Sequence, residues 1–160
     1  MIEGIRPELE PILAAANQAP SGENCQPWHF KVKDFHIEMH LLPDRDQSYY
    51  GWGQRASYMA NGAAIENMCI AASVEGFKST VTYLPTPADQ YHVANIDLVK
   101  DPSDGVDLLH EHVLLRATNR KPYMIVSPSE HELEELAKAQ LAGGYGKILF
   151  TTELPKIKRL

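Results

Sequence analysis

Cysteine is scarce in this sequence: Cys25 and Cys69 are the only two among 160 residues. Two cysteines cannot build a disulfide framework, so the sequence predicts a protein of a reducing compartment, and we expect a cytoplasmic location. No apolar run approaches the roughly 20 residues that cross a bilayer, and residues 1–7 lack the pattern of a signal peptide. We therefore expect no membrane association.

Basic charge is also scarce. The 15 lysines and arginines face 21 acidic residues, which gives a formal net charge of −6. A nucleic-acid-binding protein usually has the opposite balance or a long basic stripe, so we expect no nucleic-acid partner. Low-complexity tracts and short repeats are missing too, and the hydrophobic content of 44% is enough for a packed core.

The spacing of apolar residues predicts an α+β fold with an antiparallel sheet flanked by helices. Strands are expected at 28–32, 35–42, 79–84, 91–99 and 147–152, and helices at 6–18, 54–75, 105–115 and 129–139. The second helix is apolar on most of its circumference, which favours a place at the centre of the fold or in a subunit interface. Gly76 follows it as a predicted C-cap.

Residues 19–28 form a loop between the first helix and the first strand. One reading is an ordinary connection, in which Trp28 anchors the strand to the core. The other is a binding loop in which Pro20 and Pro27 restrict the backbone and Gly22 permits positive φ. In that loop Ser21, Asn24 and Gln26 would offer hydroxyl and amide groups to a flat heteroaromatic ring.

Residues 116–123 form the second unusual segment, with three cations and two polar side chains close together. Most such runs are solvated surface patches. The alternative is a phosphate grip, in which Arg116 and Arg120 supply guanidinium forks and Thr118 a hydroxyl donor.

Three motifs together resemble the FMN-dependent nitroreductase superfamily. Residues 19–28 are similar to its A-P-S-x-x-N-x-Q-P-W signature, and residues 62–67 to the G-A-A-x-x-N pattern of its central helix. Residues 116–123 resemble the R-x-T-N-R-x-P-F/Y element of the Acg-like branch. The resemblance implies a dimer with a long central interface helix. It also implies FMN held at the ring by Pro20, Ser21, Asn24 and Gln26, and at the phosphate by Arg116, Thr118 and Arg120.

The order of the motifs resembles that of an Acg-like tandem protein, in which two halves in one chain imitate a homodimer. In typical members a basic segment precedes the first long helix, whereas here Arg6 is a lone base and the basic segment comes late. We therefore predict a first half at 1–110 and the beginning of a second half at 111–160. The expected partner is a second copy or the rest of that second half.

The remaining candidates favour plain structural roles. His36 and His40 stand on one face of a strand about 13 Å apart, too far to share a metal, and His110 and His112 lack zinc-ligand spacing. We expect surface histidines and no metal site. Cys25 is expected to be structural or incidental, although a reactive thiol is the alternative.

The predicted function is an FMN-binding oxidoreductase. The resemblance implies hydride transfer from NAD(P)H through FMN to a small nitroaromatic or quinone-like acceptor. The flavin supplies that chemistry, so no catalytic side chain is assigned. Two alternatives stay open at this point: a flavin-binding or flavin-sequestering protein without turnover, and an interaction module that has a nitroreductase-like fold and no flavin.

Overall fold

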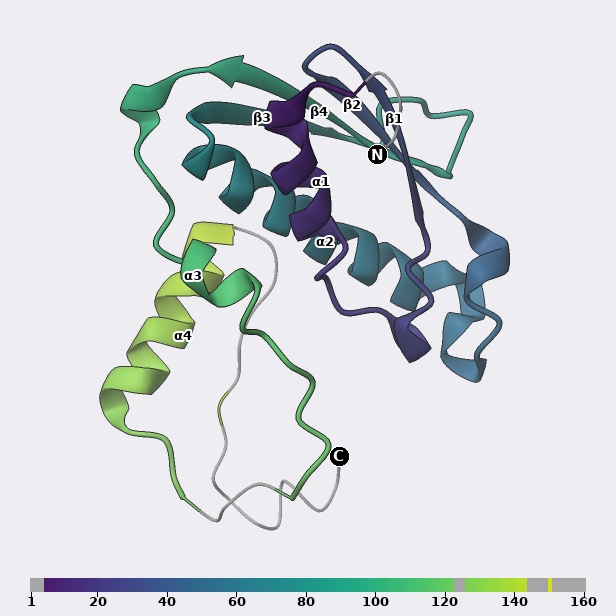
Figure 1. The fold of residues 1–160 in the computed structure, drawn as a ribbon. Helices are drawn as coiled ribbons and strands as arrows, with labels where there is room; N and C mark the ends of the chain where they lie inside the picture. Colours follow the sequence, from purple (N-terminus) through teal and green to yellow (C-terminus); the bar gives the residue numbers. More distant parts are fainter. Residues whose placement is uncertain (1–4, 123–125, 144–149, 151–160) are drawn as a thin grey trace. The chain divides into compact units, whose positions relative to one another are not determined.

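The computed structural model describes residues 5–122, 126–143 and 150. The chain divides into two compact units, residues 1–118 and 119–160. The first unit contains the whole β-sheet and the helices that cover it, and the second contains one long helix (Figure 1).

The first unit is built on a four-stranded antiparallel sheet. Its strands are β1 (Trp28–Lys33), β2 (His36–Leu41), β3 (Phe77–Tyr83) and β4 (His92–Lys100), arranged in the order β1-β2-β4-β3. β1 and β2 form one hairpin, β3 and β4 form another, and the two hairpins join through β2 and β4. The predicted α+β fold is confirmed.

Alternation along the strands decides which side chains are buried. On β2, Ile37, Met39 and Leu41 are almost completely buried, whereas the intervening polar residues are partly exposed. The same pattern continues on β4, where Ile96 and Leu98 are buried and Asp97 between them is exposed. A sheet with one apolar and one polar face needs helices on one side only.

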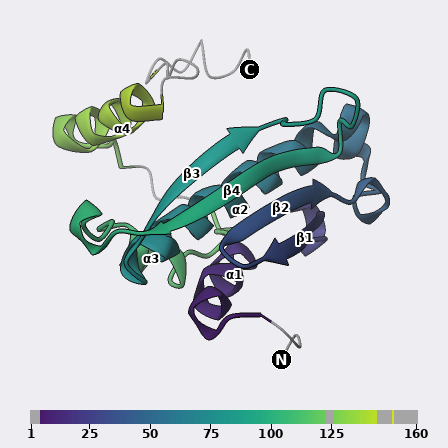
Figure 2. The same ribbon diagram turned by 90° about the horizontal axis from the view of Figure 1, so that it is seen from above.

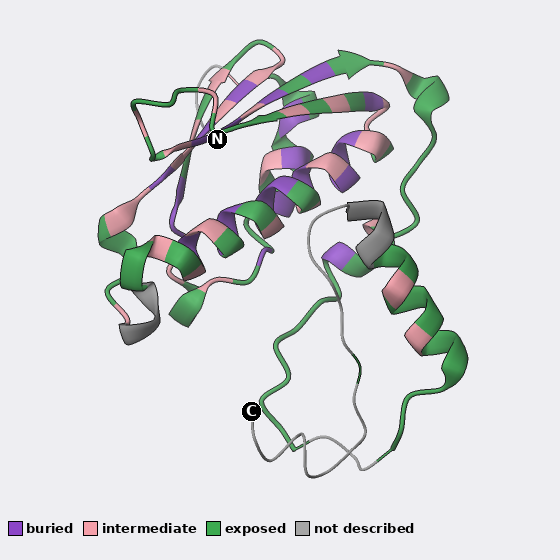
Figure 3. Cartoon of the chain, turned by 180° about the vertical axis from the view of Figure 1, so that it is seen from behind, coloured by how far each residue is buried: buried purple, intermediate pink, exposed green. Residues whose placement is uncertain are grey.

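Two helices cover the apolar face, as Figure 2 shows from above the sheet. α1 (Glu10–Ala16) follows a 3-10 turn at Pro7–Leu9, and α2 (Arg55–Val74) runs beneath the strands. Ala64, Ile65 and Met68 of α2 are almost completely buried. Figure 3 colours each part of the chain by its burial. Gly76 ends the helix with φ of +72°, which confirms the predicted cap, because glycine adopts this conformation without a Cβ clash.

One side of α2 stays exposed within the first unit. Arg55, Met59, Gly62 and Glu66 lie at helical spacing along it, and Met59 is 77% exposed. The exposed stripe therefore includes charged residues, and the expectation of an apolar surface over most of the helix was too broad.

The remaining elements are short, apart from α4 (Glu130–Gly143) in the second unit. α3 (His110–Val113) is a single turn, so the helix expected over 105–115 is mostly absent. Further 3-10 turns lie at Gly22–Asn24, Pro43–Arg45, Tyr49–Gln54 and Pro102–Asp104. Most of the strand expected at 147–152 lies outside the described residues. Among the described residues, no helix has the length and apolar character of a membrane span.

α4 begins with a reciprocal cap. The Ser129 hydroxyl accepts a hydrogen bond from the Glu132 backbone N–H at 3.2 Å, while the Glu132 carboxylate accepts one from the Ser129 N–H at 2.7 Å. This capping box satisfies two backbone donors at the helix start, which is why the predicted helix begins at residue 130.

Burial on α2 predicts the effect of truncation. Met68→Ala removes a fully buried side chain and should lower the free energy of unfolding by about 2–5 kcal/mol. Glu66→Ala, on the exposed side of the same helix, should change it by less than about 0.5 kcal/mol. Urea denaturation of both variants measures the difference, and equal losses would mean that α2 is turned differently about its axis.

Candidate functional site

The loop at residues 19–28 connects α1 to β1 and is fixed at both ends. Ala19, Pro27 and Trp28 are buried. The Trp28 indole donates a hydrogen bond to the Asn17 side-chain oxygen at 3.1 Å, so the end of the loop is tied to its start. The structure confirms Trp28 as the core anchor of the strand.

Three residues of this loop adopt left-handed backbone conformations without being glycine. They are Glu23, Asn24 and Gln26, with φ of +50°, +57° and +48°. Such conformations cost about 1 kcal/mol or more each in residues with a Cβ, and they concentrate at binding and active sites. Gly22, which the sequence analysis singled out as permitting positive φ, does not adopt it, and the left-handed positions follow it.

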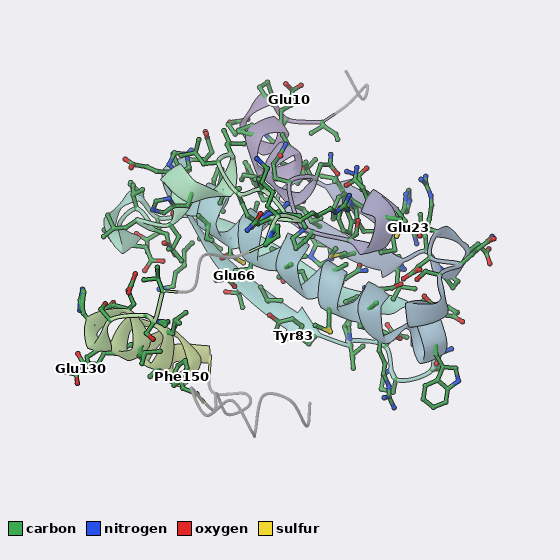
Figure 4. All side chains as sticks on the ribbon, turned by 90° about the horizontal axis from the view of Figure 1, so that it is seen from below. Glu10, Glu23, Glu66, Tyr83, Glu130 and Phe150 are labelled. Atoms are coloured by element: carbon green, nitrogen blue, oxygen red, sulfur yellow. The ribbon has the colours of Figure 1, made fainter. Side chains whose placement is uncertain are left out.

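Hydrogen bonds inside the loop maintain this conformation. The Ser21 hydroxyl accepts from the Gln26 backbone N–H at 3.0 Å, and the Gln26 amide donates to the Asn17 carbonyl at 3.2 Å. Ser21 and Gln26 are half-buried, whereas Pro20 and Asn24 are exposed. Within the described part of the chain, the Asn24 side chain makes no hydrogen bond, so its amide faces solvent without a competing contact. Figure 4 shows this segment beside the label of Glu23.

A buried carboxylate, that of Asp46, lies next to the loop. Asp46 is 7% exposed and accepts hydrogen bonds from the Ser48 N–H and hydroxyl, at 3.0 and 2.6 Å, and from the Ser57 hydroxyl at 3.4 Å. These bonds lower the pKa of Asp46, with the Ser48 hydroxyl as the largest cause. A Cβ on Gly22 would lie 3.6 Å from Asp46 Oδ2, so carboxylate and loop are in direct proximity.

Cys25 lies in the same environment, and its thiol is poorly suited to act as a nucleophile. Burial raises its pKa, and the negative charge of Asp46 raises it further. A thiol with a raised pKa stays protonated near neutral pH, whereas reactive cysteines have a lowered one.

α2 holds the loop and α1 through two asparagine amides. Asn61 donates to the carbonyl oxygens of Pro27 at 3.1 Å and of Ser57 at 2.8 Å. Asn67 donates to the Ala15 carbonyl at 3.0 Å, near the end of α1. Asn67 belongs to the predicted motif of the central helix, with no contact expected of it, and Asn61 and Asp46 are not among the predicted site residues. Their polar character at helix or loop positions next to apolar residues was the available signal.

Arg116, far along the chain, contacts the segment that directly follows α1. Its guanidinium donates to the Gln18 carbonyl at 2.7 Å, two residues before Pro20. A cation at the last carbonyls of a helix is favourable by itself, so this contact also fits a purely structural cap. Thr118 is exposed at the end of the first unit, and Arg120 lies in the second unit. The structure thus brings Arg116 beside the start of the loop. The residues predicted to contact the flavin ring, Pro20, Ser21, Asn24 and Gln26, all lie within that loop in the first unit.

Comparisons with known proteins give a consistent result. The chain is 31% identical over 131 residues to "Putative NAD(P)H nitroreductase acg" of Mycobacterium tuberculosis, and 28% identical over 113 residues to "Putative NAD(P)H nitroreductase Rv3131" of the same organism. These matches cover 79% and 70% of this chain but 38% and 33% of the relatives, so the chain spans between a third and two fifths of their length. No family model matches.

A solved structure shares the fold. It is the crystal structure of "a putative nitroreductase in complex with fmn" from Desulfovibrio desulfuricans, and it superimposes with a TM-score of 0.51 at 20% identity. The superposition covers 81% of this chain and 89% of that one. At this level of identity the likeness concerns the architecture of sheet and helices.

The Asp46 network predicts a pH-dependent contribution to stability. Asp46→Ala leaves the Ser48 and Ser57 donors without their acceptor and should lower the free energy of unfolding by about 1–3 kcal/mol at pH 7. Because the folded pKa is lowered, this contribution is present above the unfolded value of about 3.9 and is lost as the pH falls through the folded pKa.

The matched control is Asp44→Ala, because Asp44 is exposed two residues earlier in the same loop. Urea unfolding of both variants between pH 7 and pH 3 should show a gap between them that narrows with acidity. A gap that is constant with pH would contradict the role of the charged carboxylate.

Proposed function

We propose that this chain, which belongs to the nitroreductase superfamily, is part of an FMN-dependent oxidoreductase with NAD(P)H as electron donor and a small nitroaromatic or quinone-like acceptor. The observation that carries the proposal is the strained loop at residues 19–28, whose backbone is held by the hydrogen bonds among Asn17, Ser21 and Gln26.

The donors and acceptors of the loop fit the polar edge of an isoalloxazine ring. Such a ring presents both N–H and carbonyl groups, and amides can bond to either kind. Asn24 is exposed and uncommitted among the described residues, while Ser21 and Gln26 lie beside it on a backbone held by internal hydrogen bonds. When bound, FMN would supply the redox chemistry, because its ring can accept and release a hydride.

The residues of this chain would bind and orient. Pro20, Ser21, Asn24 and Gln26 would contact the ring, and the strained backbone would keep their groups in place before binding, which reduces the entropy cost of association. Arg116, Thr118 and Arg120 would hold the phosphate. The Arg116 guanidinium has five N–H donors and uses one of them on Gln18 in this structure, so the others are available to an anion.

The phosphate assignment predicts a selective loss of affinity. Arg116→Ala removes a charge-assisted contact worth about 1.5–3 kcal/mol, so it should weaken FMN binding roughly tenfold or more. Riboflavin lacks the phosphate and should bind equally well to both proteins. Arg6→Ala, which removes an exposed arginine paired with Asp34, should leave FMN binding unchanged. Flavin fluorescence titration measures all three.

Equal losses for FMN and riboflavin would instead assign Arg116 to the cap of α1. Anaerobic addition of NAD(P)H to the FMN-loaded protein then separates the remaining alternatives. Bleaching of the flavin absorbance supports the oxidoreductase, whereas a stable yellow complex favours a flavin-sequestering protein. Failure to bind any flavin favours the interaction module.

We further propose that the exposed stripe of α2 packs against a second copy of the chain or against a further nitroreductase-like half. Gly62 lies in the middle of this stripe, and a Cβ there would meet nothing within 4 Å. A small residue at that position allows close approach of another helix, which supports an interface along α2.

Association through α2 is tested by Gly62→Glu. Open space around Gly62 means that the variant should fold, while the added charge should block the helix contact and shift a dimer to monomer. Thr80→Glu, on the exposed polar face of the sheet, should leave the dimer intact. Sedimentation equilibrium at micromolar concentration measures the oligomeric state of the wild type and both variants. A wild-type chain that sediments as a stable monomer would refute self-association.

A further inference from the structure

A second cluster of polar groups lies on the face of the sheet opposite to α2. Glu38 and His40 belong to β2 and His92 to β4. Each of the three side chains offers one ligand atom such that all these atoms lie within 4.8 Å of one another. We propose that Glu38, His40 and His92 form a binding site for a divalent first-row transition metal ion, with Zn²⁺ as the ion that fits best.

A β-bulge creates this arrangement. Regular antiparallel pairing from Glu38↔Asn95 and Met39↔Ala94 would place Val93 opposite His40. The register instead shifts between Met39 and His40, so that His92 becomes the partner of His40. Bulges re-aim side chains in this way and occur next to functional sites. The two imidazole rings consequently stack, with centroids 4.5 Å apart and planes 16° from parallel.

The donor set matches zinc. Two imidazole nitrogens and one carboxylate oxygen are ligands that Zn²⁺ accepts in tetrahedral sites, with water in the open position, whereas Mg²⁺ and Ca²⁺ prefer oxygen ligands alone. His40 Nε2 already lies 3.2 Å from Glu38 Oε2. Bonds of about 2.0–2.2 Å place tetrahedral ligand atoms about 3.4 Å apart. Side-chain rotations that shorten the longest separation, at most 4.8 Å, by up to about 1.4 Å therefore bring the three atoms into range.

Neighbouring groups orient the ligands. His92 Nε2 lies 2.7 Å from Asn95 Oδ1, and His92 Nδ1 lies 3.0 Å from Thr86 Oγ1. When one nitrogen binds the ion, the other keeps its partner and fixes the ring, as is usual for metal-bound histidine. Lys31 lies 3.8 Å from Glu38 but is largely exposed, so its side chain can move away.

The side chains are accessible to an ion from solvent without being fully hydrated. His40 is 17% and Glu38 is 37% exposed at the side chain. An ion held here would connect β2 to the first residue of β4 and so join the two hairpins of the sheet. Binding to the folded chain alone would raise the thermal stability in proportion to the logarithm of the free ion concentration.

The test is calorimetric titration of the full, tag-free chain with ZnCl₂ after treatment with a chelator. We expect the wild-type chain to bind one Zn²⁺ at this site. His40→Ala and His92→Gln should each weaken this binding about tenfold or more. The matched control is His36→Gln, which removes a histidine from the same face of β2 that pairs with Asp97 instead. Its Zn²⁺ binding should equal that of the wild type.

Glu38→Gln keeps the shape of the side chain and removes the charge, so it tests the site even if a histidine variant folds poorly. It should also weaken Zn²⁺ binding, and Zn²⁺ should raise the melting temperature of the wild type and of His36→Gln only. Binding that survives in His40→Ala, His92→Gln and Glu38→Gln would overturn the proposal. An equal loss of Zn²⁺ affinity in His36→Gln would overturn it as well, because the affinity would then depend on the number of histidines and not on this cluster.

Discussion

The side-chain amide of Asn61 is the contact on which the position of the candidate flavin loop depends. It donates to the Pro27 carbonyl, which also accepts a hydrogen bond from the Leu42 N–H at 3.1 Å. One buried amide of α2 is therefore joined to the point where the loop enters the sheet. With Asn67 bonded near the end of α1, the central helix holds the chain on both sides of the loop that contains the strained residues.

This fixation has a cost inside the helix. Asn61 Oδ1 is buried and has no hydrogen-bond partner among the described residues. An unsatisfied buried oxygen typically costs about 1–3 kcal/mol. A leucine or methionine would suit the apolar surroundings better, so the asparagine is explained by the two carbonyl oxygens to which it donates, one of which ties α2 to Pro27. Packing alone gives no reason for it.

The fold was largely predictable because its signals are local. Alternation in β2, helical spacing in α2 and the glycine at residue 76 each depend on a few neighbouring residues, and all three predictions are confirmed. The contacts around the loop were not predictable in this way. Asp46 approaches Gly22 from another segment, and Arg116 reaches Gln18 across 98 residues, so only the tertiary structure brings these groups together. The histidine cluster was missed for the same reason, since spacing along β2 says nothing about His92 on β4.

The strand order β1-β2-β4-β3 also affects the order in which parts of the sheet can form during folding. Each hairpin closes a short loop, of two residues in the first case, and can form early. The central β2–β4 pairing is different, because His36 and Asp97, which meet at 2.7 Å, are 61 residues apart in sequence. Closing so long a segment costs entropy that grows by roughly 0.6 kcal/mol with each doubling of its length. We therefore expect the rate-limiting step of folding to be the pairing of one preformed hairpin with the other. The segment that contains α2, which lies between the hairpins in sequence, must be closed in that step.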